Sequence, residues 1–137
     1  MSDRPELVGI ILCELVLQDV LRREAISCVN IIPNSVMTPG FPTQLPLMYA
    51  FAQLSGSKAG FSYQFKVLDP DGNMTANSPV QKVDPLPNEN FTHKIINAFT
   101  GLTFTKEGIY QFLLEVDGVT TGTLPFQVVQ APPQATA

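Results

Sequence analysis

The sequence predicts an all-β fold, an antiparallel β-sandwich of roughly seven to nine strands with immunoglobulin-like layering. Residues 108–118 carry the main signal, because apolar and polar side chains alternate along them with the period of a half-buried strand. Asp117-Gly118 then supplies a turn, and residues 123–129 resume an extended pattern, so the two segments form a hairpin. Turn signals elsewhere recur at about the spacing that such sandwiches require.

The length of 137 residues is typical of one domain, and we expect a single β-sandwich domain over residues 1–130. Hydrophobic residues make up 45% of the chain and charged residues only 15%, so the surface must depend on uncharged polar groups rather than on ion pairs. Residues 131–137 have too little to bury and are expected to form a disordered tail.

The charges and the apolar runs of the sequence limit the classes of partner that are expected. A net charge of −4 and eight scattered basic residues argue against a nucleic-acid partner, since affinity for phosphate backbones needs clustered Lys and Arg. The apolar run over residues 7–17 is interrupted by Glu14, is too short to span a bilayer, and has no signal-peptide cleavage site after it. We therefore expect a cytoplasmic protein with no membrane partner.

The first strands are expected at residues 7–13, a continuous apolar run, and at residues 26–32, which are rich in β-branched side chains and end at Pro33-Asn34. Residues 14–24 between them fit either a short helix or a strand that runs on into a charged turn. The second alternative is favoured.

A loop is expected over residues 37–46, because three prolines and a glycine remove backbone donors and exclude both helix and central strand. A strand follows at residues 47–54. Residues 61–67 then alternate cleanly between apolar and polar side chains, which indicates a half-buried strand.

Residues 69–73, Asp-Pro-Asp-Gly-Asn, form the clearest turn in the chain, because Pro and Gly supply the two backbone conformations that a turn needs. Residues 74–83 predict a weak edge strand interrupted by Pro79. One long or bent strand is expected at residues 91–104, before the final hairpin.

Tyr110 lies two residues after the glycine that opens its strand and resembles the tyrosine corner of immunoglobulin-like sandwiches, whose hydroxyl bonds back to the main chain. The alternation predicts which side chains fill the core. These are Ile11, Phe61, Tyr63, Phe65, Tyr110, Phe112, Leu114 and Val128.

Catalytic and cofactor signatures are absent from the sequence. Asp69, Asp71 and Asn73 have the spacing that begins a calcium loop, but the glycine and the final bidentate acid are misplaced, so a simple turn is expected. His93 is the only histidine, and no nucleophile context accompanies it, so we expect a surface or edge-strand residue rather than a catalytic one. The sequence thus predicts no enzyme, no metal and no cofactor.

Cys13 and Cys28 are the only cysteines, too few for a disulfide framework, and their spacing is not that of a metal or redox motif. If the chain turns near residues 20–21, the two lie opposite each other on neighbouring strands, which leaves their pairing open. In a reducing compartment we expect two buried, unreactive thiols.

Met37, Phe41 and Leu45 form the candidate interaction loop, since apolar side chains in a segment without regular structure would expose apolar surface. The alternative is that Phe41 and Leu45 tuck back and cover one end of the core. Residues 74–83 offer a second candidate, an exposed strand edge.

Five segments are distinctive in combination: Leu12-Cys13-Glu14, residues 45–49, residues 67–72, residues 107–112 and residues 124–129. Together they resemble an uncharacterised family of small bacterial proteins known only as a domain of unknown function. The resemblance covers nearly the whole chain except the tail. It implies a sandwich fold and a bacterial cytoplasmic setting, and it offers no functional residues.

The function expected from the sequence is that of a non-enzymatic binding or scaffolding module, which acts on a protein partner or forms a homodimer. A carbohydrate-binding sandwich is an alternative, although sugar platforms need exposed aromatic rings and most aromatics here fall on core faces. A small enzyme with an unrecognised site is a further alternative.

Overall fold

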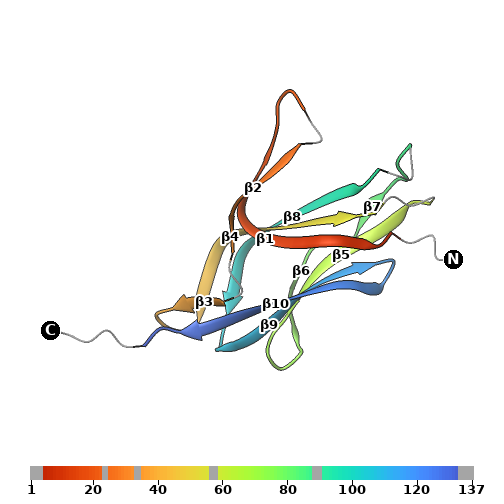
Figure 1. Cartoon of the computed structure of the whole chain (residues 1–137). Helices are drawn as coiled ribbons and strands as arrows, with labels where there is room; N and C mark the ends of the chain where they lie inside the picture. The colour runs from red at the N-terminus through yellow and green to blue at the C-terminus, as the bar shows by residue number, and fades with distance from the viewer. Residues whose placement is uncertain (1–4, 23–24, 33–34, 56–58, 88–90, 133–137) are drawn as a thin grey trace.

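The computed structural model describes residues 5–22, 25–32, 35–55, 59–87 and 91–132. Within these ranges it contains ten β-strands and no helix, which confirms the all-β prediction and exceeds the expected number of strands (Figure 1). The strands are β1 (Leu7–Gln18), β2 (Ile26–Ile31), β3 (Ser35–Thr38), β4 (Thr43–Leu54), β5 (Phe61–Leu68), β6 (Met74–Asn77), β7 (Gln81–Val83), β8 (His93–Phe104), β9 (Gly108–Val116) and β10 (Val119–Gln130).

Two sheets make up the fold. A four-stranded sheet has the order β2-β1-β4-β8, and a six-stranded sheet has the order β3-β10-β9-β5-β6, with β7 also paired to β5. The expected antiparallel arrangement is wrong at one place, because β3 pairs with β10 in parallel. After β2 the chain passes from the four-stranded sheet to the other sheet, where β3 pairs with β10, the last strand of the chain. The local sequence pattern of residues 35–38 does not specify this neighbour.

The core lies between the two sheets, which both contribute aromatic rings to it. Phe99 of β8 meets Phe65 of β5 and Phe112 of β9 edge to face, with ring centroids 6.4 Å and 6.1 Å apart. Such aromatic pairs add specific geometry to the burial of apolar area. The final hairpin is as predicted, with Asp117 and Gly118 both at positive φ in the turn.

Most of the predicted core is confirmed. Phe61, Phe65, Tyr110, Phe112, Leu114 and Val128 are buried, and Tyr63 is partly buried against them. The prediction that Ile11 is a core residue is wrong. Leu12 fills the core instead, so Ile11, which is opposite Phe51 on β4, faces the outside of the sheet. In a continuous apolar strand the sequence does not say which alternate set points inward.

The predicted loop at residues 37–46 is also wrong in part. Residues 37–38 belong to β3, and β4 begins at Thr43, so Pro46 lies within a strand between β1 and β8 in the sheet order. The pairing of β4 with β1 ends at Tyr49 of β4, which lies opposite Cys13 of β1. At Pro46, β4 is therefore flanked by β8 only, among the described residues. Proline is tolerated there because this stretch is locally an edge.

Other local predictions hold. Residues 14–18 continue as strand, and the weak strand at residues 74–83 is split into β6 and β7 around Pro79, at the edge beside β5. The expected tail falls largely outside the described residues, at 133–137. Its first residue, Ala131, donates a main-chain hydrogen bond to Thr38 of 2.7 Å.

Candidate functional site

A two-stranded arm, residues 14–22 and 25–31, projects from the rest of the molecule (Figure 1). At its base β1 changes partner: among the described residues Cys13 is the last residue of β1 opposite β4, and from Leu15 to Gln18 the register of β1 is with β2. The arm is therefore a hairpin that extends past the four-stranded sheet instead of packing on it.

The turn of the arm is ordered by Asp19. Its Oδ1 accepts hydrogen bonds from the main-chain amides of Leu21 and Arg22, both 2.8 Å, and the guanidinium of Arg22 lies 3.4 Å from its Oδ2. The Arg22 amide, then the Leu21 amide, lowers the pKa of the Asp19 carboxyl. This local network orders residues 19–22 of the arm.

The tip of the arm, Val20 and Leu21, is apolar and exposed. Val20 and Leu21 expose 89% and 94% of their surface, more than any other large apolar residue in the described part of the chain. Leu15 and Leu17 along the arm are exposed as well. Ile31, at the end of the arm, is exposed too. Scattered exposed apolar residues are common, but five on the described residues of one projecting hairpin are a concentration of apolar surface.

An apolar groove of about 570 Å³ lies at the base of the arm. Its walls include Glu14 of β1, Ile31 of β2, Val36 of β3, and Leu45 and Leu47 of β4. We call it the base groove. Glu14 supplies an acid at its margin, and its carboxylate accepts a 2.9 Å hydrogen bond from the side chain of Asn30, which has a positive φ of 54°.

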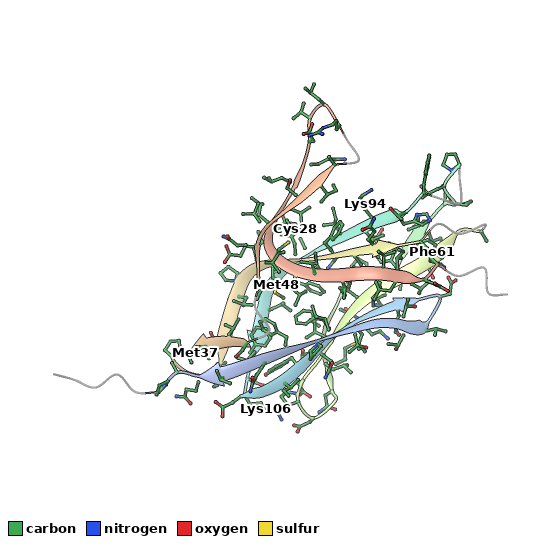
Figure 2. The ribbon with its side chains drawn as sticks, viewed as in Figure 1. Cys28, Met37, Met48, Phe61, Lys94 and Lys106 are labelled. Atoms are coloured by element: carbon green, nitrogen blue, oxygen red, sulfur yellow. The ribbon has the colours of Figure 1, made fainter. Side chains whose placement is uncertain are left out.

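A second hollow of about 440 Å³ lies between the arm and the outer face of the four-stranded sheet. Val16 and Ile26 border it from the arm, and Tyr49, Lys94 and Ile96 border it from the sheet. Figure 2 shows Lys94 on β8 below the arm. This hollow carries a basic group, whereas the base groove carries an acidic one.

Cys13 and Cys28 occur where the arm joins the sheet, and both are free thiols. They are not cross-strand partners, since Cys28 is opposite Val16 and Cys13 is opposite Ile31. Burial, and next the neighbouring Cys28 thiol, raises the pKa of Cys13 to about 11. The thiols therefore interact, and that of Cys13 is held in its protonated form.

The three residues of the predicted interaction loop do not form one exposed surface. Met37 is exposed on β3 (Figure 2). Phe41 and Leu45 pack against the core, as the alternative interpretation of this loop expected, and Leu45 also lines the base groove.

Two open strand edges face each other on the side of the molecule formed by β8 and β6. They border a cavity of about 260 Å³, lined by residues that include Asn77, Ser78, Thr100 and Gly101. Besides the predicted edge at residues 74–83, the described residues thus contain a second and longer strand edge, that of β8. The other side of β8 pairs with β4.

His93 lies on an edge strand, as one of the two alternatives expected, since it begins β8 at the end of its sheet, but its side chain is buried rather than on the surface. Its ring packs on Phe61, and its Nε2 has no hydrogen-bond partner among the described residues. Burial lowers the pKa of its imidazole. Among the described residues, no nucleophilic side chain hydrogen-bonds to this nitrogen.

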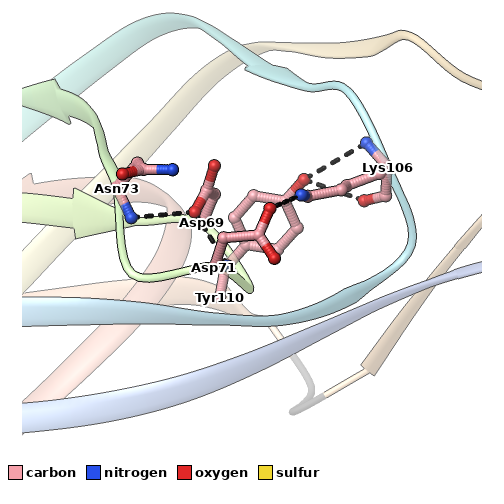
Figure 3. A network of polar contacts seen from close by, with 5 residues as sticks. All are labelled: Asp69, Asp71, Asn73, Lys106 and Tyr110. Carbon is pink, nitrogen blue, oxygen red and sulfur yellow. Dashed lines mark hydrogen bonds and ion pairs between the residues drawn. The ribbon is translucent and has the colours of Figure 1, made fainter.

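The calcium-like turn is held together by its own groups (Figure 3). Asp69 Oδ1 accepts hydrogen bonds from the amides of Asp71 and Asn73, both 2.9 Å, and the carboxylate of Asp71 pairs with Lys106. Residues 69–73 thus form the structural turn between β5 and β6, and the Asp71–Lys106 pair ties this turn to the one between β8 and β9.

A family model matches residues 10–129 of the chain: the family of unknown function DUF6941. The chain belongs to this family. The expected resemblance to an uncharacterised domain is thereby confirmed. The matched range includes the residues of the arm and of the base groove, so both features lie within the DUF6941 domain. No curated protein matches the chain.

This DUF6941 chain has no helix, among its described residues, of the length and apolarity needed to cross a membrane. The features of the site that sequence reasoning missed are Val20 and Leu21. A signal for them was present: two apolar residues stand inside a charged segment, where a turn would expose them.

Proposed function

We propose that this protein is a non-enzymatic binding module that docks onto another polypeptide through the tip of its arm. The observation that carries the proposal is the near-complete exposure of Val20 and Leu21 on an ordered turn. A two-stranded hairpin is marginally stable by itself in water, and a partner surface that covered these side chains would stabilise it.

We propose further that the body is an immunoglobulin-like sandwich. In such folds strands A, B and E share one layer, and C, F and G share the other. The orders β1-β4-β8 and β10-β9-β5 fit this arrangement in chain order. Tyr110 near the start of β9 supports the assignment, because its hydroxyl donates a 2.8 Å hydrogen bond to the carbonyl of Lys106, as in a tyrosine corner. On this assignment β2 and the arm are an addition between A and B.

The positions of the side chains that could take part in catalysis support a binding role over a catalytic one. The imidazole of His93 is enclosed by the core, and the carboxylates of Asp69 and Asp71 are engaged in a turn. A sugar platform has little support, since most aromatic rings lie in the core. The free thiols of Cys13 and Cys28 favour a cytoplasmic setting.

Site-specific crosslinking tests the proposal. A photoreactive amino acid is placed at Leu21, and at Val80 as a control, because Val80 is also exposed but lies between β6 and β7. We expect polypeptide adducts in the source cells from position 21 well above those from position 80. Equal yields would contradict the proposal, as would a turnover that His93→Ala abolishes without unfolding the protein.

A further inference from the structure

We propose that the partner of the arm is a second copy of this chain. Two arms lie side by side in opposite directions, and the tip of each fills the base groove of the other. The inference rests on the proposed function and adds the identity of the partner and the surface that receives the tip.

The geometry of one chain suggests this arrangement. The base groove begins at Glu14 and the tip at Val20, so the two are separated by the length of the arm. Six residues of strand span about 20 Å. When two arms run antiparallel about a two-fold axis, each tip is brought to the base of the other arm. The contact is isologous and closes at two copies, as in most homodimers.

The groove and the tip match in chemistry. Ile31 and Leu47 are exposed apolar residues on the walls of the groove, and Leu45 adds a partly buried one. The volume of about 570 Å³ falls in the usual range of sites that bind apolar groups. Val20 and Leu21 of a second copy would bury their surface there without displacing the core.

Charge supports the same orientation. Each copy carries a net charge of −4, so two copies repel unless the interface brings opposite charges together. Arg22 follows Val20 and Leu21, and although it lies 3.4 Å from Asp19 of its own turn, its side chain is largely exposed. Glu14, which accepts a hydrogen bond from Asn30, stands at the margin of the base groove. In the proposed dimer Arg22 lies between Asp19 of its own chain and Glu14 of the second copy, twice in each dimer. The hollow under the arm, with Lys94, lacks this match.

The strand edges leave room for the contact. β2 is the last strand of its sheet, as far as the described residues show. Its outer edge is thus available to a second arm, and association would convert a two-stranded ribbon into a wider and more stable layer.

Sedimentation velocity of the purified full chain over a concentration series tests the inference. We expect a monomer–dimer equilibrium in which Leu21→Asp raises the dissociation constant about tenfold or more, as for the loss of a central contact. Val80→Asp is the matched control and should leave it unchanged. Leu47→Asp, on the groove side, should weaken the dimer as Leu21→Asp does.

A charge exchange makes the test specific to the proposed pairing. Arg22→Glu and Glu14→Arg should each weaken the dimer, and the two together should restore most of the affinity. Circular dichroism and urea unfolding check that every variant is folded. A protein that stays monomeric up to about 1 mM, so that its dissociation constant is weaker than millimolar, overturns the inference. So does a dimer that the tip and groove variants leave intact, or a double exchange weaker than both single ones.

Failure of the inference and failure of the proposed function are distinguishable. If the purified protein stays monomeric while crosslinks from position 21 capture a different polypeptide, the second copy is excluded as the partner and the binding role stands. If position 21 captures nothing above the control, the binding role itself is wrong.

Discussion

His93 and Phe61 meet edge to face, with ring centroids 4.9 Å apart and planes at 87°. The contact joins β8 of one sheet to β5 of the other and keeps the imidazole out of water. Because Nε2 has no partner among the described residues, protonation would place an uncompensated charge in the core.

The stability of the protein should therefore fall in mild acid. Burial lowers the pKa of His93 from its usual value of 6.5 in the folded chain, so only the unfolded chain takes up a proton near that pH. The contribution of this group is fully present above about pH 6.5 and is lost as the pH falls toward the folded pKa. Urea unfolding between about pH 8 and pH 5 measures this loss. His93→Leu should remove this part of the slope, and parallel curves for the two proteins would contradict the prediction.

Cys13 should resist thiol reagents in the native protein. With a pKa of about 11, roughly one thiol in a thousand is thiolate at pH 8, and the side chain is also buried. Cys28→Ala removes the contribution of the second thiol but keeps burial, the largest cause of the raised pKa, so maleimide labelling followed by intact mass should still find Cys13 unmodified in this variant until denaturant is added. Rapid native labelling of that variant would show that the site is open. A wild-type mass two hydrogens short would show instead that the two thiols had joined.

Tyr110→Phe should destabilise the fold by about 1–2 kcal/mol, since the Lys106 carbonyl loses a part-buried hydrogen bond while the ring stays in place. Denaturant unfolding measures the change. Tyr63→Phe is the control, because its hydroxyl has no hydrogen-bond partner among the described residues and its ring is also partly buried. If both variants lost the same stability, the Lys106 bond would not be the cause.

Where the sequence alternates, it predicts the fold well. β9 is recognisable because only one of its faces is buried, and the turn at residues 69–73 is recognisable because Pro and Gly each impose a backbone conformation. The split of residues 74–83 follows from Pro79 for the same reason. In these segments local chemistry and tertiary structure agree.

The errors arise where tertiary context decides. Pro46 argues against a strand, but the partner of β4 changes beside it and leaves a locally open edge. Ile11 and Leu12 are equivalent by composition, and only the packing of the sheet selects between them. Val20 and Leu21 were missed because burial is the default expectation for such side chains, and exposure depends on how far the hairpin extends.

Cys13 and Ile31 are cross-strand partners, which means that the chain leaves and re-enters the body at a single place. The arm is in this sense an insertion whose two ends are already held together by strand pairing, so its length is not constrained by the path of the chain through the sheets. Lengthening or shortening this insertion would cost little loop-closure entropy. The reach of the molecule can thus change from one relative to another while the architecture beneath it stays the same.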